Sequence, residues 1–250
     1  MEKKRYAILD DIRGLILINM IIYHTIWNSV YIFGEKWRWY GSEFVYCWQQ
    51  SICWGFILLS GFCWSFGKVK WKRGVAVFAA GLLVSLSTFV AVPENTIIFG
   101  VLTCLGTCML LMVPLHPWLQ KKNPWGGIMV SFGLFLLTRN INYGCLGFGE
   151  WTLQRLPGSW YANLLTAYFG LPPADFVSAD YFSVFPWFFL FLTGYFLHNL
   201  AQQKRLFPYL NLSKTEPKNM PLEWMGRHSL FIYLLHQPVI YGVLCLCYLY

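Results

Sequence analysis

Uncharged stretches dominate the chain and predict its architecture. Seven of them have, or nearly have, the roughly 17–25 apolar residues that a transmembrane helix needs. They cover residues 14–34, 44–67, 74–93, 95–120, 123–138, 181–203 and 228–250. We therefore expect an all-α, polytopic transmembrane helix bundle of about seven spans, formed by residues 1–250 as a single domain. No cleavable signal peptide is expected, because the first apolar run is too long and no small-residue cleavage site follows it.

A further uncharged stretch, residues 156–174, contains three prolines and Asn163, which disfavour a continuous helix. We expect an interfacial or re-entrant helix here, within a long outer segment at residues 139–180. With seven spans and a cytoplasmic N-terminus, 15 of the 19 basic residues lie inside, and the other four lie outside, namely Lys36, Arg38, Arg139 and Arg155. An eighth span would nearly equalise the two sides. The excess of inner Lys and Arg therefore favours seven spans with the C-terminus outside.

Composition narrows the class of protein. Hydrophobic residues make up 57% of the chain and charged residues only 12%, whereas a soluble domain is about 25% charged. So few charges cannot cover a water-exposed surface, which excludes a soluble fold or a disordered chain and indicates a lipid bilayer as the surroundings. The net charge of +8 is explained by basic inner loops and does not indicate a nucleic-acid partner. Cys104 and Cys108, four residues apart, are interpreted as apolar packing, so no metal is predicted.

Ionisable side chains inside an apolar span are costly and are functional candidates for that reason. His24 lies in the first span, on one helical stripe with Arg13, 11 residues earlier, and Asn28, four residues later. The stripe places a cation at the cytoplasmic edge and an imidazole about 16 Å deeper. The structural alternatives are an ordinary inner arginine and a core histidine whose hydrogen bonds are satisfied.

The later spans add further polar candidates. Ser229, Tyr233 and His236 follow one another at i, i+4 and i+7, on one face of the last span. Hydrogen bonding between helices explains them about equally well. Asp180, just before the sixth span, could cap that helix or hold an acceptor from the outer side. In the second span, Gly61 allows a close approach of another helix.

Four stretches of sequence carry a resemblance to a known family. They read LDDIRGLILINMIIYH, FILLSGF, DYFSVFPWFFLFLTGYFL and GRHSLFIYLLHQPV, in this order. The set resembles the bacterial relatives of the heparan-α-glucosaminide N-acetyltransferase catalytic domain and, more broadly, the integral-membrane acyltransferases that acylate bacterial surface sugars. Arg13 and His24 match an Arg and a His of the latter group. The lysosomal enzyme differs, because it has Asn at the position of His24 and its proposed catalytic His further along.

The resemblance implies an acyltransferase of the bacterial cytoplasmic membrane. Acetyl-CoA or another acyl-CoA would enter from the cytoplasm as co-substrate, and the acceptor would be an amine or hydroxyl of a sugar or glycan at the outer side. Arg13 and the loop KVKWKR would bind the anionic coenzyme A, and His24 would act as the catalytic base. The expected substrate-binding or orienting residues are Arg13, Asn28, Ser229, Tyr233, His236 and Asp180. A homodimer is left open.

Two other functions fit the same residues. Histidines at the middle of a membrane serve as proton relays in transporters, although no inverted repeat of the transporter kind is evident here. His24 and His236 could also serve as the axial ligands of a haem. That reading requires the two rings to face each other at one depth.

Overall fold

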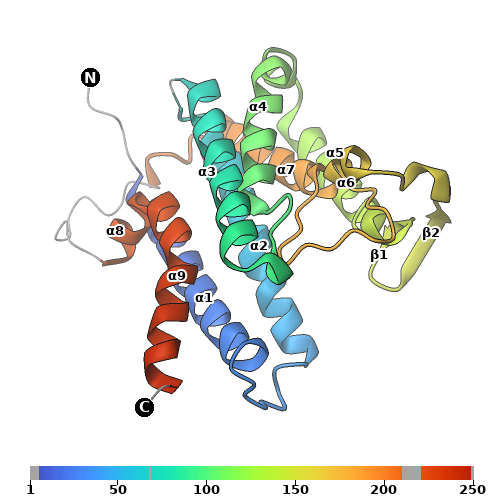
Figure 1. Ribbon diagram of the computed structural model, residues 1–250. Coiled ribbons are helices and arrows are strands. Elements are labelled where there is room, and N and C mark those ends of the chain that lie inside the picture. The colour runs from blue at the N-terminus through green and yellow to red at the C-terminus, as the bar shows by residue number, and fades with distance from the viewer. Residues whose placement is uncertain (1–5, 68, 210–220, 249–250) are drawn as a thin grey trace. The chain divides into compact units, whose positions relative to one another are not determined.

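The computed structural model describes residues 6–67, 69–209 and 221–248, and most of them are helical (Figure 1). The helices are α1 (Ala7–Tyr31), α2 (Glu43–Trp64), α3 (Lys70–Ala91), α4 (Val101–Leu119), α5 (Pro124–Leu137), α6 (Leu164–Phe169), α7 (Val184–Gln203), α8 (Pro221–Arg227) and α9 (Ser229–Tyr248). Short 3₁₀ turns lie at Pro93–Asn95, Ile141–Tyr143 and Gly158–Trp160. The expected all-α class is therefore confirmed.

The chain forms two compact units. The first comprises residues 1–56 and 204–250, so it joins the two ends of the sequence, and the second comprises residues 57–203. The boundary between them falls inside α2.

In the first unit, α1 packs against α8 at two glycines. A Cβ on Gly14 would lie 2.2 Å from the carbonyl oxygen of Leu222, and one on Gly226 would lie 1.9 Å from that of Asp10. A larger side chain would collide with backbone that cannot move aside, so both positions require glycine. Helix α9 also packs along α1, and the core of this unit contains Leu17, Met20 and Ile52.

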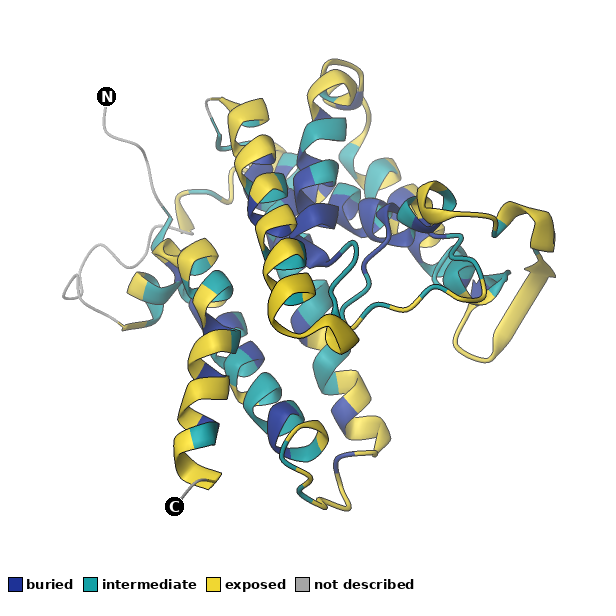
Figure 2. Cartoon of the chain, in the orientation of Figure 1, coloured by how far each residue is buried: buried dark blue, intermediate teal, exposed yellow. Residues whose placement is uncertain are grey.

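In the second unit, α3 pairs with α4, and α5 pairs with α7. The end of α2 meets α7 closely, because a Cβ on Gly61 would lie 2.0 Å from the carbonyl oxygen of Phe191. The reverse contact is equally tight, because a Cβ on Gly194 would lie 2.1 Å from the carbonyl oxygen of Leu58. The close approach predicted at Gly61 is confirmed. Figure 2 shows the buried parts of α4 and α7 in dark blue, and the largest buried side chains include Trp64, Tyr195, Phe135 and Phe191.

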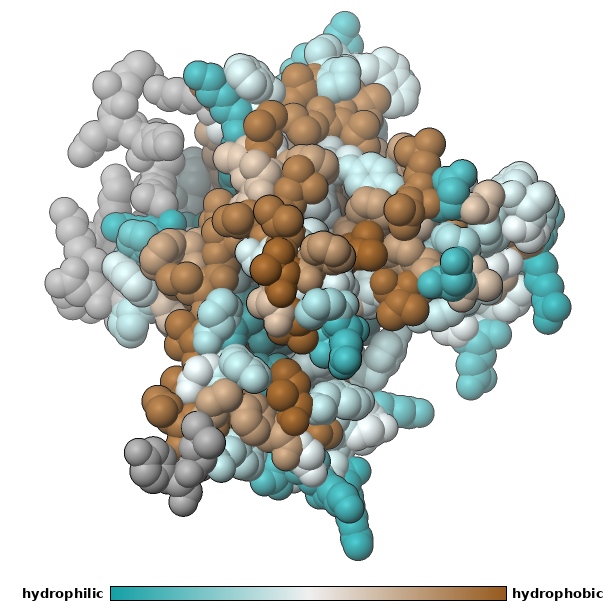
Figure 3. Space-filling model, viewed as in Figure 1, coloured by the Kyte–Doolittle hydropathy of each residue, from teal (hydrophilic) through white to brown (hydrophobic). Residues whose placement is uncertain are grey.

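Among the described residues, four helices are long and apolar enough to cross a membrane, namely α3, α4, α7 and α9. Apolar side chains cover the exposed surface of α3 (Figure 3), where Leu82, Leu86 and Phe89 are all more than half exposed. Such a surface is stable in lipid and unstable in water. The helices α1, α2 and α5 coincide with the other three uncharged runs, and the total of seven spans stays a prediction.

Residues 139–180, which are predicted to lie outside, differ in detail from the expected structure. Strands β1 (Cys145–Phe148) and β2 (Trp151–Arg155) form an antiparallel hairpin that we did not expect. Its tight turn uses Gly149 in the left-handed region, at φ 58°, which glycine adopts at little cost. Residues 156–174 contain only the six-residue α6 as an α-helix, whose N-terminus is capped by the side chain of Asn163. At 1.5 Å per residue α6 is far too short to span a bilayer.

Candidate functional site

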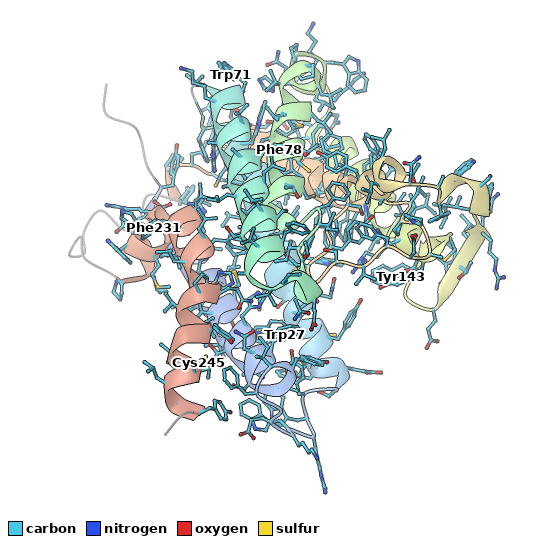
Figure 4. All side chains as sticks on the ribbon, in the orientation of Figure 1. Trp27, Trp71, Phe78, Tyr143, Phe231 and Cys245 are labelled. Atoms are coloured by element: carbon cyan, nitrogen blue, oxygen red, sulfur yellow. The ribbon has the colours of Figure 1, made fainter. Side chains whose placement is uncertain are left out.

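The two histidines of the first and last spans lie side by side in the first unit. The ring centroids of His24, on α1, and His236, on α9, are 4.9 Å apart, with the rings tilted by 55°. His236 is 8% exposed. In Figure 4, α1 can be followed by the labelled Trp27 and α9 by Phe231 and Cys245. Two residues separated by more than 200 positions thus form one imidazole pair.

A chain of two amides reaches the first of these rings. The side chain of Asn28 donates a hydrogen bond to Oε1 of Gln237 at 3.1 Å, and Nε2 of Gln237 lies 2.9 Å from Nδ1 of His24. Asn28 is almost fully buried, at 1% exposed. It therefore reaches His24 through Gln237, which our reading of the sequence did not single out. The available signal was an amide inside an apolar run, directly after a candidate histidine.

The second ring is tethered to its own helix. Nδ1 of His236 bonds to the carbonyl oxygen of Tyr233 at 2.5 Å, and because a carbonyl oxygen only accepts, this nitrogen carries the hydrogen. Nε2 of His236 is buried and has no hydrogen-bond partner within the described part of the chain. The ring of Tyr233 packs beside His236, at 5.1 Å between centroids. Ser229 is the first residue of α9, about 10 Å along the helix axis from His236.

Arg13 has protein partners near the start of α1. Its guanidinium lies 2.8 Å from Oδ1 of Asp10 and donates to the carbonyl oxygen of Gly226 at 3.3 Å. The side chain is only 17% exposed. Arg13 therefore ties α1 to α8, in addition to any contact with a substrate phosphate.

Asp180 belongs to the second unit, and the predicted cap of the sixth apolar helix is wrong. Its carboxylate accepts a hydrogen bond from the backbone N–H of Val101, the first residue of α4, and lies beside Gly100. Desolvation raises the pKa of Asp180 to about 6, against the lowering effect of that hydrogen bond. The following helix, α7, begins only at Val184, and Phe185 is extended because it precedes Pro186. Asp180 therefore caps α4 instead of α7.

Basic groups gather near the start of α3, in the second unit. Nζ of Lys70 lies 4.2 Å from the ring centroid of Trp64, and it is close enough to His116 and His198 to interact with them electrostatically. Among the described residues, no side chain of the N-cap position Val69 bonds to the first turn of α3. A helix start with an adjacent lysine suits an anionic ligand.

Neither metal nor haem chemistry gains support from these contacts. The described part of the chain holds no group of three His, Cys, Asp or Glu side chains that could bind a metal ion. Sγ of Cys104 and Sγ of Cys108 are 4.0 Å apart, and both side chains are buried. The rings of His24 and His236 touch at the distance usual for an aromatic pair, which leaves no space for a porphyrin between them.

Comparison with known proteins identifies the family. The family model described as "Heparan-alpha-glucosaminide N-acetyltransferase, catalytic" matches residues 5–238, which is most of the chain. The match includes α1 with His24 and the part of α9 that holds His236. No curated protein and no solved structure matches the chain. The chain belongs to the heparan-alpha-glucosaminide N-acetyltransferase catalytic family, a family of membrane acetyltransferases.

Proposed function

We propose that this protein transfers an acetyl group from cytoplasmic acetyl-CoA to an amine or hydroxyl of a sugar at the outer side of a bacterial cytoplasmic membrane. The observation that carries the proposal is the contact between the rings of His24 and His236 inside two apolar helices. An imidazole can accept and return a proton near neutral pH, which acyl transfer to an amine or hydroxyl requires. The family supplies the reaction class, and the imidazole pair supplies the groups to perform it.

The proposed reaction is direct transfer. The acceptor nitrogen or oxygen attacks the carbonyl carbon of the thioester, and its proton passes to an imidazole of the pair. The carbon–sulfur bond then breaks, and the imidazole returns the proton to the thiolate of coenzyme A. The products are the acetylated acceptor and free coenzyme A, so the imidazole is regenerated in each cycle. In the alternative, His24 itself takes the acetyl group and passes it on.

Coenzyme A carries several negative charges, and two sets of cations could bind it. Arg13 lies about 16 Å along α1 from His24 and is already engaged with Asp10. The start of α3, with Lys70 and Lys72, has an uncapped helix N-terminus in addition to its charges. Ser229, Tyr233 and Asp180 stay proposed as substrate-binding or orienting residues.

The test is transfer of labelled acetyl from acetyl-CoA to an amino-sugar acceptor by purified protein in lipid nanodiscs. His24→Gln should lower kcat by about 100-fold or more, the usual effect of losing a general base. His228→Gln is the matched control, because this histidine is exposed and its Nδ1 bonds only to the carbonyl oxygen of Trp224. Full activity of His24→Gln would remove this residue from the reaction. Label that stays on His24 without acceptor would contradict direct transfer.

A further inference from the structure

The side chain of Gln237 is the only described group that bonds to a ring nitrogen of His24. Asn28 and His236, both expected from the sequence to be binding or orienting groups, do not take this place. Asn28 bonds to Gln237, and Nδ1 of His236 is occupied by the carbonyl oxygen of Tyr233. The state of the His24 ring therefore depends on a residue one position beyond His236.

An amide has a donor end and an acceptor end, so the chain from Asn28 through Gln237 to His24 has a direction. With Nε2 of Gln237 facing His24, Nδ1 of the ring accepts and Nε2 of the ring carries the hydrogen. If both amides rotate by half a turn, Oε1 of Gln237 faces Nδ1 instead, and the Asn28 oxygen accepts from Gln237. In both directions one hydrogen bond joins Asn28 to Gln237 and one joins Gln237 to His24. Only the donor and the acceptor of each bond are exchanged.

The two directions give His24 different chemistry. In the first, Nε2 of His24 is a hydrogen-bond donor and has no lone pair for a proton. In the second, Nδ1 carries the hydrogen and Nε2 is free to act as a base. The protonated ring carries a hydrogen on both nitrogens. Nδ1 is then a donor, so it can form a hydrogen bond with the oxygen of Gln237 but not with its NH₂ group.

We propose that Gln237, held by Asn28, is the positioning residue that sets the tautomer of His24 and permits its Nε2 to take the acceptor's proton. The inference rests on the proposed acetyl transfer. During the reaction the acceptor proton moves to Nε2 of His24, while the Nδ1 hydrogen stays bonded to Oε1 of Gln237. The same proton then leaves Nε2 for the thiolate sulfur, so neither amide gains or loses a proton. A third group that orients a base is a recurring feature of proton-transfer sites.

Nitrogen NMR of ¹⁵N-histidine-labelled protein tests the positioning directly, because the two ring nitrogens give different shifts in the two tautomers. The His24 signals are identified by their loss in His24→Gln. In Gln237→Glu the side chain can only accept, so Nδ1 of His24 should carry the hydrogen. In Gln237→Met, which has nearly the same shape, Nδ1 loses its partner and both tautomers should appear. Gln203→Glu, the same change at an exposed position of α7, should leave the His24 signals unchanged.

Kinetics give the second readout. Gln237→Met should lower kcat by about 10- to 100-fold, because the base spends less time in its active tautomer, with little change in the KM for acetyl-CoA. Unchanged His24 signals in Gln237→Met would overturn the positioning role, whatever the activity. Altered signals in a protein that transfers no acetyl group would leave the positioning role standing and overturn the proposed function.

Discussion

At the scale of single residues, polar side chains of the first apolar run form hydrogen bonds with an amide of the last apolar run. Asn28 is almost fully buried and bonds to Gln237, and His24 bonds to the same amide. A buried polar group without a partner costs about 1–3 kcal/mol, so such groups gather where partners are available. Within this cluster two buried atoms lack a hydrogen-bond partner among the described residues, namely Oδ1 of Asn28 and Nε2 of His236, whose ring lies beside that of His24.

Arg13→Ala should destabilise the protein, because it removes an ion-pair partner of Asp10, which is only 5% exposed. The expected loss is about 1–3 kcal/mol, as for other buried groups that lose a hydrogen-bond partner. A lower Tm of the protein in detergent would show it. Arg227→Ala is the matched control, because the Arg227 side chain is 38% exposed and its pair with Glu223 should contribute less to stability. An unchanged Tm together with a raised KM for acetyl-CoA would instead assign Arg13 to the donor phosphates alone.

Asp180 should make stability depend on pH. Its pKa is raised to about 6 from 3.8, so the folded protein holds this proton more tightly than the unfolded chain does. Its contribution is therefore most favourable below about pH 4 and is lost as the pH rises through about 6.

Asp180→Asn removes the titration while keeping the shape of the side chain, so the Tm should fall less between these pH values than it does in the wild type. Asp175→Asn, in the exposed loop before it, should keep the wild-type profile. If the Tm of Asp180→Asn falls as much as that of the wild type, the pH dependence does not come from Asp180.

At the scale of elements, glycines decide which helices can approach closely. The contacts of Gly14 and Gly226 bring α1 and α8 together, and those of Gly61 and Gly194 bring the end of α2 against α7. In each pair the atom that blocks a Cβ is a backbone carbonyl oxygen, which no change of rotamer can move. The sequence indicates that small residues permit such contacts, but the partner helix is known only from the structure.

Gly226→Ala should therefore cost about 1–3 kcal/mol or more, because its Cβ would fall 1.9 Å from the carbonyl oxygen of Asp10. On α9, Gly242 has no atom within 4 Å of an added Cβ, so Gly242→Ala should be neutral or slightly stabilising. Thermal unfolding of the two variants in the same detergent measures the difference. Equal Tm values would show that the close contact of α8 with α1 contributes nothing to stability.

At the scale of the whole molecule, the distribution of Lys and Arg predicts which ends of the helices face the cytoplasm. Seven spans with an inner N-terminus place residues 139–180 outside, and four helices already meet the length and apolarity that crossing requires. The hairpin and α6 would then lie on the side of the acceptor.

Single cysteines in a cysteine-free background test this topology. Tyr143→Cys should react with a membrane-impermeant maleimide in intact cells, since Tyr143 (Figure 4) is 80% exposed and belongs to the segment predicted to lie outside. Lys121→Cys, at an exposed position in a predicted inner loop, should react only after the membrane is opened. The opposite pattern would reverse the orientation, and with it the sides assigned to donor and acceptor.

Local features of the sequence predicted the helical class, the positions of the long helices and the candidates His24 and His236, because apolar runs and ionisable residues within them can be recognised without the fold. It did not reveal the hairpin at residues 145–155, whose strands are too short for a clear alternation. Only the tertiary structure decided that His24 touches His236, that Gln237 bonds to His24, and that Asp180 caps α4. Each of these contacts joins residues far apart in the chain, and a hydrogen bond depends on distances of a few tenths of an ångström that packing alone sets.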